Sequence, residues 1–288
     1  IERVKVENKD QDREFVMVPF SLYKGCDYWV PPIISEELES MDKEKNPVFE
    51  NAEAEFYIAK KDGVTVGRIA AMVNWVEIEE QKKNKLRFGW YDTIDDLEVS
   101  KKLLESVIEF GKKRKLEFVD GPVGFSNMDK AGLLIEGYEE LNTMITWYHY
   151  PYQKEHLKKL GFSKLAEWVE YKIKIFSAED APEKVKKFSK IIQQRYELKV
   201  LNFKSRKEII PYVDKMFELL NVTYSNLQTY VTIKQYQIDF YKEKFIKYIH
   251  PDFIKCCLDK DDNLIAFLIT MPSFLSLIHI SEPTRLDG

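Results

Sequence analysis

The sequence contains little cysteine, only Cys26, Cys256 and Cys257 in 288 residues. Three cysteines cannot all pair, and Cys256 and Cys257 are adjacent, so in a strand their side chains point to opposite faces. No CxxC or Cys/His spacing typical of zinc is present. These absences exclude a disulfide-stapled mini-protein and a zinc module, and they predict a protein of the reducing cytoplasm.

The sequence also lacks a charge excess and a membrane-spanning run. Its 44 basic and 48 acidic residues give a net charge of −4, which indicates neither a nucleic-acid nor an anionic-lipid partner. The basic run 112–115 is expected to be a solvated helix end. The apolar run 264–280 includes Pro272 and has 17 positions, fewer than the ~20 needed to cross a bilayer. No Walker loop, Ser/His/Asp spacing or metal cluster is visible, so we expect no metal.

The residues that are present indicate a soluble globular protein, with 44% apolar and 32% charged residues. A length of 288 predicts about two domains. The chain starts at Ile1 with no signal-peptide pattern. Residues 276–285 look like translated adapter read-through, so 275–288 is expected to be a non-native tail and the natural chain to continue differently.

Hydrophobic periodicity predicts alternating strands and helices over residues 1–176. The Asp62-Gly63 pair between two β-rich runs predicts a hairpin. The strands are expected at 1–8, 54–59, 64–73, 85–91, 117–119, 144–147 and 166–175, and the helices at 10–24, 35–46, 97–111, 130–135 and 152–160. This order predicts one complete domain, 1–176.

The second half repeats the opening order of the first. A charged stretch with Pro182 predicts a linker and connecting helix over 177–198. Strands at 199–203, 253–258 and 264–270 and helices at 206–220 and 233–249 then give β-α-α-β-turn-β. We expect a tandem duplication, with 199–274 as a partial second domain.

Several short motifs, in order, carry a family resemblance over residues 20–171. They are Trp29-Val30-Pro31-Pro32, Asn46-Pro47, Val66-Gly67-Arg68-Ile69-Ala70-Ala71, Phe88-Gly89-Trp90, Gly121-Pro122, Phe125-Ser126-Asn127, Gly132 to Tyr138, and Leu160-Gly161-Phe162. Together they resemble the GNAT (N-acetyltransferase) superfamily, and more closely a bacterial group of two-unit GNAT-like proteins. The resemblance implies an α/β (α+β) fold of the acyl-CoA N-acyltransferase type, with a mixed, mostly antiparallel sheet flanked by helices.

The resemblance also implies a reaction: acyl transfer from acetyl-CoA or another acyl-CoA to a small amine or amino acid. In such a fold strand 88–92 separates from strand 118–121, and the pantetheine arm inserts between them. This places the cofactor against Phe88, Gly89, Trp90 and Tyr91.

Further site residues follow the same resemblance. The position at which the family often has a proton-donating tyrosine is Leu157 here, so the catalytic candidates are Tyr152 and His149, at the loop where the cleft opens. Ser126 and Asn127 are substrate-binding candidates on their own residues, because they follow a strand end and offer hydrogen-bond donors and acceptors, and Tyr148 joins them from the aromatic cluster.

Each of these assignments has an alternative in the residues themselves. The aromatic cluster at 148–152 could fill the gap between strands instead of lining a pocket, and Ser126 and Asn127 could form a turn before a helix at 130–135. His156 is expected on the surface, and Arg68 is expected to pair with Glu53 or Glu55.

The loop 92–98 departs from the family pattern, because it is acidic where a pyrophosphate would lie. Asp92, Asp95 and Asp96 would repel a diphosphate, and Asp95 with Glu98 predicts a capping box that uses the helix's own N–H groups. This loop favours the alternative function, a non-catalytic GNAT-like protein that binds a small molecule.

Overall fold

The computed structural model describes residues 1–6, 8–143, 145–174, 177, 179–227, 229–245 and 249–271. The described chain forms two compact units, residues 1–168 and the residues from Val169 onward. The predicted boundary at residue 176 stays a prediction, and the predicted tail 275–288 lies outside the described residues. No helix in these ranges is both long enough and apolar enough to cross a membrane.

The first unit is built on a five-stranded sheet in the order β1-β2-β3-β4-β5. Strands β1 to β4 pair antiparallel, whereas β5 pairs parallel to β4. The predicted hairpin is confirmed: Asp62 and Gly63 both have positive φ, as a tight primed turn requires. The bounds are β1 (Glu2–Arg3), β2 (Ala52–Lys61), β3 (Val64–Asn74), β4 (Lys85–Thr93) and β5 (Phe118–Asp120).

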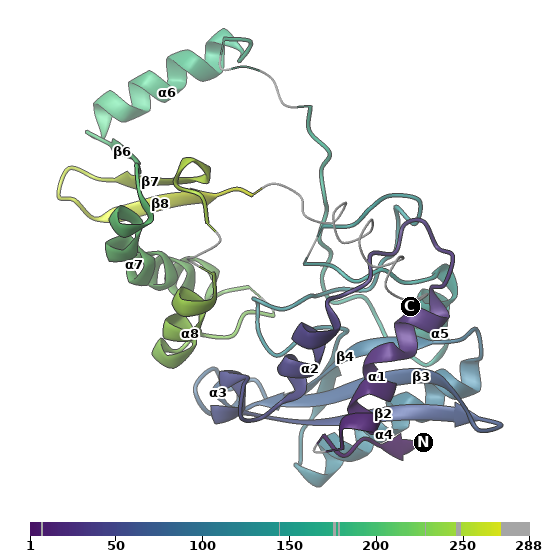
Figure 1. Cartoon of the computed structure of the whole chain (residues 1–288). Coiled ribbons are helices and arrows are strands. Elements are labelled where there is room, and N and C mark those ends of the chain that lie inside the picture. The colour runs from purple at the N-terminus through teal and green to yellow at the C-terminus, as the bar shows by residue number, and fades with distance from the viewer. Residues whose placement is uncertain are drawn as a thin grey trace. The chain divides into compact units, whose positions relative to one another are not determined.

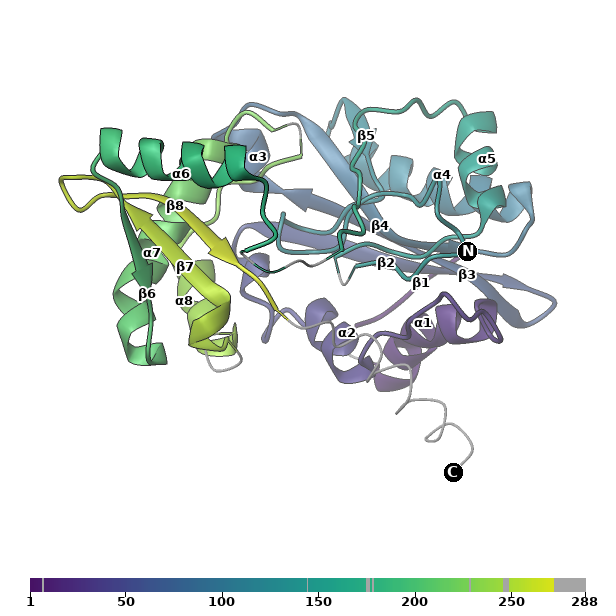
Figure 2. The ribbon, with the colours of Figure 1, turned by 90° about the horizontal axis from the view of Figure 1, so that it is seen from above.

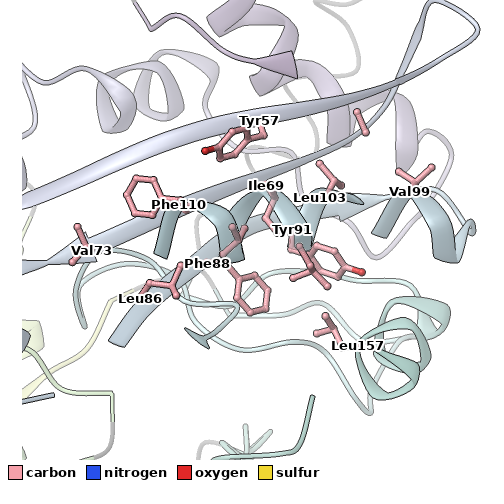
Figure 3. Close-up of a cluster of buried hydrophobic side chains, with 14 residues drawn as sticks. Tyr57, Ile69, Val73, Leu86, Phe88, Tyr91, Val99, Leu103, Phe110 and Leu157 are labelled. Carbon is pink, nitrogen blue, oxygen red and sulfur yellow. The ribbon is translucent and has the colours of Figure 1, made fainter. Parts of the chain in front are cut away.

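Helices cover both faces of this sheet (Figures 1 and 2). Helices α1 (Lys9–Leu22) and α2 (Ile34–Met41) lie on one face, and α4 (Leu97–Lys113) lies on the other. Side chains alternate along the strands, so that β3 sends Ala70 and Met72 toward α1 and α2, and Ile69 and Ala71 toward α4. Figure 3 shows the α4-side core. The predicted fold class, a mixed α/β fold with a mostly antiparallel sheet between helices, is confirmed.

The region after β5 differs from the prediction. The first unit continues through helix α5 (Pro151–Lys159) and also contains the short α3 (Trp75–Glu79) and η1 (Pro47–Glu50). Residues 130–135 are not a helix, because Gly132 has φ +88° and Ala131 forms a β-bridge with Val123. Residues 145–147 and 166–174 form no strand, and their predicted strand ends, Met144 and Ile175, lie outside the described residues.

The second unit has an antiparallel sheet in the order β6-β7-β8. Its core joins the sheet to α7 through Phe203, Ile209, Val213 and Ile254. The predicted order of strands and helices after the linker is observed in the described residues. The elements are α6 (Glu183–Arg195), β6 (Lys199–Asn202), α7 (Arg206–Tyr224), α8 (Gln235–Phe245), η3 (Pro251–Phe253), β7 (Ile254–Leu258) and β8 (Leu264–Ile269).

Candidate active site

Strand β4 extends beyond its partner β5. The two strands pair only from Lys85 to Arg87, after which Val123 N donates to Phe88 O at 2.8 Å and the chains part. Beyond that point α5 supplies side chains to the edge of β4. Gln153 Nε2 donates to Tyr91 O at 3.0 Å, and the Tyr152 hydroxyl donates to Thr93 O at 2.7 Å. The predicted cofactor-binding segment therefore lies where β4 has left its neighbouring strand.

A β-bulge interrupts β4 at this place. The register with β3 shifts between Arg68 and Ala70, and Trp90 has φ +48°. A non-glycine residue in this left-handed region is strained, and such bulges redirect side chains. Here Trp90 packs on the α1/α2 side, whereas Phe88 and Tyr91 are buried on the α4 side. At the edge of β4, Gly89 and Trp90 therefore present mainly backbone groups to a ligand.

A buried ion pair lies beside the bulge. Arg68 Nε and Asp92 Oδ2 are 2.7 Å apart, with side chains 3% and 8% exposed. The Tyr23 hydroxyl donates to Asp92 Oδ1 at 2.7 Å, and burial together with the Asp92 charge raises the pKa of Tyr23 well above its usual value. The predicted pairing of Arg68 with Glu53 or Glu55 is wrong, because Arg68 lies opposite Asp92 in the β3–β4 register.

Glu37, on α2, completes this group, which we call the Asp92 cluster: Tyr23, Glu37, Arg68, Asp92 and Gln153. Glu37 accepts a hydrogen bond from Trp90 Nε1 at 2.8 Å and lies 3.8 Å from Arg68 Nη1. Gln153 Oε1 also accepts from the Tyr23 hydroxyl at 3.3 Å. Elements distant in sequence therefore join two carboxylates and a guanidinium in a largely desolvated place beside the free edge of β4.

The predicted catalytic and aromatic residues lie next to this cluster. Tyr23 packs against Tyr148 and Tyr150, with ring centroids 5.5 and 5.1 Å apart. His149 is 1% exposed, and its Nδ1 accepts from Leu134 N at 3.3 Å. Burial lowers the pKa of His149 to about 4, although Asp92 opposes this change, so the imidazole is neutral at pH 7. Burial raises the pKa of Tyr152, and the negative charge of Asp95 raises it further, so the hydroxyl keeps its proton.

The predicted substrate residues Ser126 and Asn127 lie in a turn. Asp129 Oδ2 accepts from Ser126 N at 2.8 Å and from Ser126 Oγ at 3.2 Å, and Ser126 Oγ accepts from Met128 N. Ser126 is buried and Asn127 is exposed. The turn offered as an alternative for Ser126 and Asn127 is therefore observed, but the helix expected after it at 130–135 is not, and the Ser126 hydroxyl organises the turn.

The N-terminus of α4 is capped within the chain. The cap is Asp96 and not Asp95 as predicted, and its side chain accepts from Glu98 N at 3.0 Å while Lys61 pairs with it at 2.8 Å. Asp95 instead lies 3.1 Å from Nε2 of His156, whose Nδ1 is 2.8 Å from Ser100 Oγ. His156 is 4% exposed, so its predicted surface position is wrong.

No pattern in the sequence indicates that Tyr23, Glu37 and Asp92 belong to one site. One feature does point to Asp92 as a site residue: it is a carboxylate at the end of a strand that is buried over its whole length. Its partners could not be found from the sequence, since they depend on the bulge and on α1 and α2 folding over the sheet.

No protein-family model matches the chain. Two curated proteins are similar to it. Protein YghO of Escherichia coli is 25% identical over 270 residues, which cover 92% of this chain and 67% of that protein. Bacterial ceramide synthase of Caulobacter vibrioides is 23% identical over 171 residues, 59% of this chain and 44% of that protein. Neither name specifies the GNAT superfamily, so the predicted membership stays a prediction.

Proposed function

We propose that the first unit transfers an acyl group from an acyl-CoA thioester to an amine. The observation that carries this proposal is the edge of β4 beyond Arg87, which β5 does not cover, with its bulge at Trp90 and the Asp92 cluster beside it. The similarity to a protein named ceramide synthase supports the same chemistry, because a ceramide is an amide formed from an acyl group and an amine. We also propose that the acyl donor is a coenzyme A thioester and that the mechanism is of the GNAT type.

The edge of β4 supplies the polar groups that such a reaction uses. A thioester arm lying along this edge would meet main-chain groups of residues 89–93, and a backbone N–H there would polarise the thioester carbonyl. Tyr152 lies at the same edge, and its hydroxyl, which keeps its proton, could donate a hydrogen bond to the leaving thiolate. For the arm to enter, the contacts of Tyr152 and Gln153 with β4 must open.

Calorimetric titration of the whole chain with acetyl-CoA and a longer acyl-CoA tests this proposal. We expect one molar equivalent to bind, and we expect D95N/D96N to bind several-fold more tightly. Asparagine keeps the cap of α4 but removes two negative charges that would repel a pyrophosphate. The control is E109Q, which removes a charge at the far end of α4 and should leave the affinity unchanged. Failure of every acyl-CoA to bind would contradict the proposal.

A non-catalytic binding protein is the second candidate, and two observations favour it. The acidic residues at the start of α4 are engaged by Lys61 and His156, and side chains of α5 fill the edge of β4. Release of free thiol from acyl-CoA, followed with a panel of primary amines, separates the two functions. Binding without amine-dependent thiol release would favour the second.

A further inference from the structure

Helix α6 has an apolar stripe that the second unit leaves exposed. Val185, Phe188 and Ile192 follow one another at intervals of three and four residues, so they lie on one face of the helix. A helix of a globular protein normally packs such a stripe into a core, as α7 does with Ile209 and Val213. By contrast, no residue of α6 is buried, although the structure describes every one of them, and the three side chains of the stripe are 47–58% exposed. The stripe is therefore accessible to a partner.

The other faces of α6 are basic. Glu183 is its single acidic residue, whereas its basic residues are Lys184, Lys186, Lys187, Lys190 and Arg195. Lys186 pairs with Glu183 at 2.6 Å, but Lys187 and Lys190 have no ion pair with any residue that the structure describes. The net charge of −4 for the whole chain conceals this feature, because the charge of α6 has the opposite sign from that of the rest. Helix α6 is thus a basic amphipathic helix.

The sheet of the second unit does not bury the stripe. Leu201 and Phe267 belong to the core against α7, and side chains alternate along each strand. The opposite face of the sheet therefore carries Val200 and Leu268, which are themselves 47% and 58% exposed. If α6 packed its stripe on this face, both sets of apolar side chains would be buried. The stripe has to find its partner elsewhere.

The positions of the charges favour a lipid surface over a nucleic acid. Lys184 and Lys186 lie on either side of Val185, and the nitrogen of Lys184 is 5.9 Å from the centre of the Phe188 ring. Long lysine side chains at such positions can cover apolar atoms while their ammonium groups reach phosphates. A nucleic acid would use the ammonium groups but leave the apolar stripe in water, whereas a membrane surface accommodates both.

We propose that α6 binds the surface of a membrane that contains anionic lipids. The helix lies in the plane of the membrane, with Val185, Phe188 and Ile192 at the boundary between headgroups and acyl chains and with its basic residues at the lipid phosphates. The binding is peripheral, since α6 has 13 residues and a membrane-spanning helix needs ~20. It does not depend on whether the first unit transfers acyl groups.

Co-sedimentation of the whole chain with lipid vesicles tests this proposal. We expect binding to vesicles of phosphatidylcholine mixed with phosphatidylglycerol, and weaker binding to phosphatidylcholine alone, because each lysine near an anionic surface adds to the attraction. Added salt should weaken the binding, since salt screens exposed charges. No binding to the mixed vesicles, or equal binding to both kinds, would overturn the proposal.

Two double variants separate the contribution of charge from that of the stripe. We expect K187Q/K190Q to bind the mixed vesicles about 30-fold more weakly, because it removes two lysines from the anionic surface. We expect F188S/I192S to lose about tenfold or more, because it removes the two largest apolar side chains of the stripe. Full binding by F188S/I192S would mean a contact by charge alone, of the kind that a nucleic acid makes, and would overturn the proposal.

Matched controls carry the same changes at other exposed positions. K102Q/K113Q removes two exposed lysines of α4, and V222S removes an exposed apolar side chain of α7. Both controls should bind the mixed vesicles as the wild type does. Losses in them equal to those in the α6 variants would show that α6 is not the binding surface.

Hydrogen exchange read by mass spectrometry locates the contact. We expect the mixed vesicles to slow exchange in α6 and to leave exchange in α7 unchanged. If F188S/I192S instead speeds exchange in the strands β6, β7 and β8 without vesicles, the stripe packs on its own sheet in solution, and the proposal is overturned.

Discussion

Replacement of Glu77 with glutamine is expected to lower the free energy of unfolding of the first unit by about 3–5 kcal/mol, since it removes the carboxylate that the buried cations Arg87 and Lys85 share. Glu77 Oε2 accepts from Arg87 Nε at 2.6 Å, and Oε1 accepts from Arg87 Nη2 at 2.8 Å. Lys85 Nζ is also 3.1 Å from Glu77. The three side chains are 1% exposed, so water cannot replace the lost carboxylate.

Urea unfolding followed by tryptophan fluorescence measures this change in one unit. All five tryptophans, Trp29, Trp75, Trp90, Trp147 and Trp168, lie within residues 1–168, so the signal reports the first unit alone. The control is E109Q. Glu109 pairs with Lys113 at 2.8 Å, but both side chains are about two-thirds exposed, so its loss should change stability far less than the loss of Glu77. A loss in E77Q no larger than that in E109Q would refute the prediction.

The carboxylate of Glu77 also makes the stability of the first unit depend on pH. Burial opposes ionisation of Glu77, but the hydrogen bonds and charges of Arg87 and Lys85 outweigh it, and the net result is a lowered pKa. Its stabilising effect is therefore complete above the ordinary glutamate pKa of ~4.3 and is lost as pH falls through the lower, folded value.

Local pattern was enough to predict most of the sheet and the helices that cover it. The Asp62-Gly63 turn and the apolar stripe of α4 are encoded within a few residues, so periodicity finds them. Prediction failed over 130–135 because the conformation there is set by contacts outside the segment. Gly132 N donates to Pro122 O at 2.8 Å, and Ala131 N donates to Ile145 O at 3.2 Å.

The candidate site was predicted in part for a similar reason. The resemblance assigned the segment from Phe88 to Tyr91 and the residues from Tyr148 to Tyr152 to one cleft, and in the structure Tyr152 does bond to β4, although residues 145–147 do not form the predicted strand. The ion pair between Arg68 and Asp92 could not be predicted, since the sequence shows only the β2–β3 hairpin and not the register of β3 on β4. Glu53 and Glu55, the partners expected for Arg68, pair with Arg114 and Arg3 instead.

Acidification from pH 6.5 to 4 is expected to cost the first unit about 3 kcal/mol through His149 alone. Burial lowers the pKa of His149 to about 4, whereas in the unfolded chain it should titrate near the ordinary value of ~6.5. Between these values the unfolded state binds the additional proton, so the free energy of unfolding falls as pH falls. The magnitude follows from ~2.5 pH units at ~1.36 kcal/mol each.

The variant H149Q separates this effect from other acid-sensitive groups. Glutamine does not titrate, and its side-chain oxygen can still accept from Leu134 N, so H149Q should lose less stability than the wild type between pH 6.5 and 4. Tryptophan-detected urea unfolding at pH 7, 5.5 and 4.5 measures the difference, with H250Q in the second unit as the control. Asp129, with its raised pKa, acts in the opposite direction, but it is common to both proteins and cancels. Equal slopes for wild type and H149Q would mean that His149 has the same pKa in the folded and the unfolded chain, and would refute the prediction.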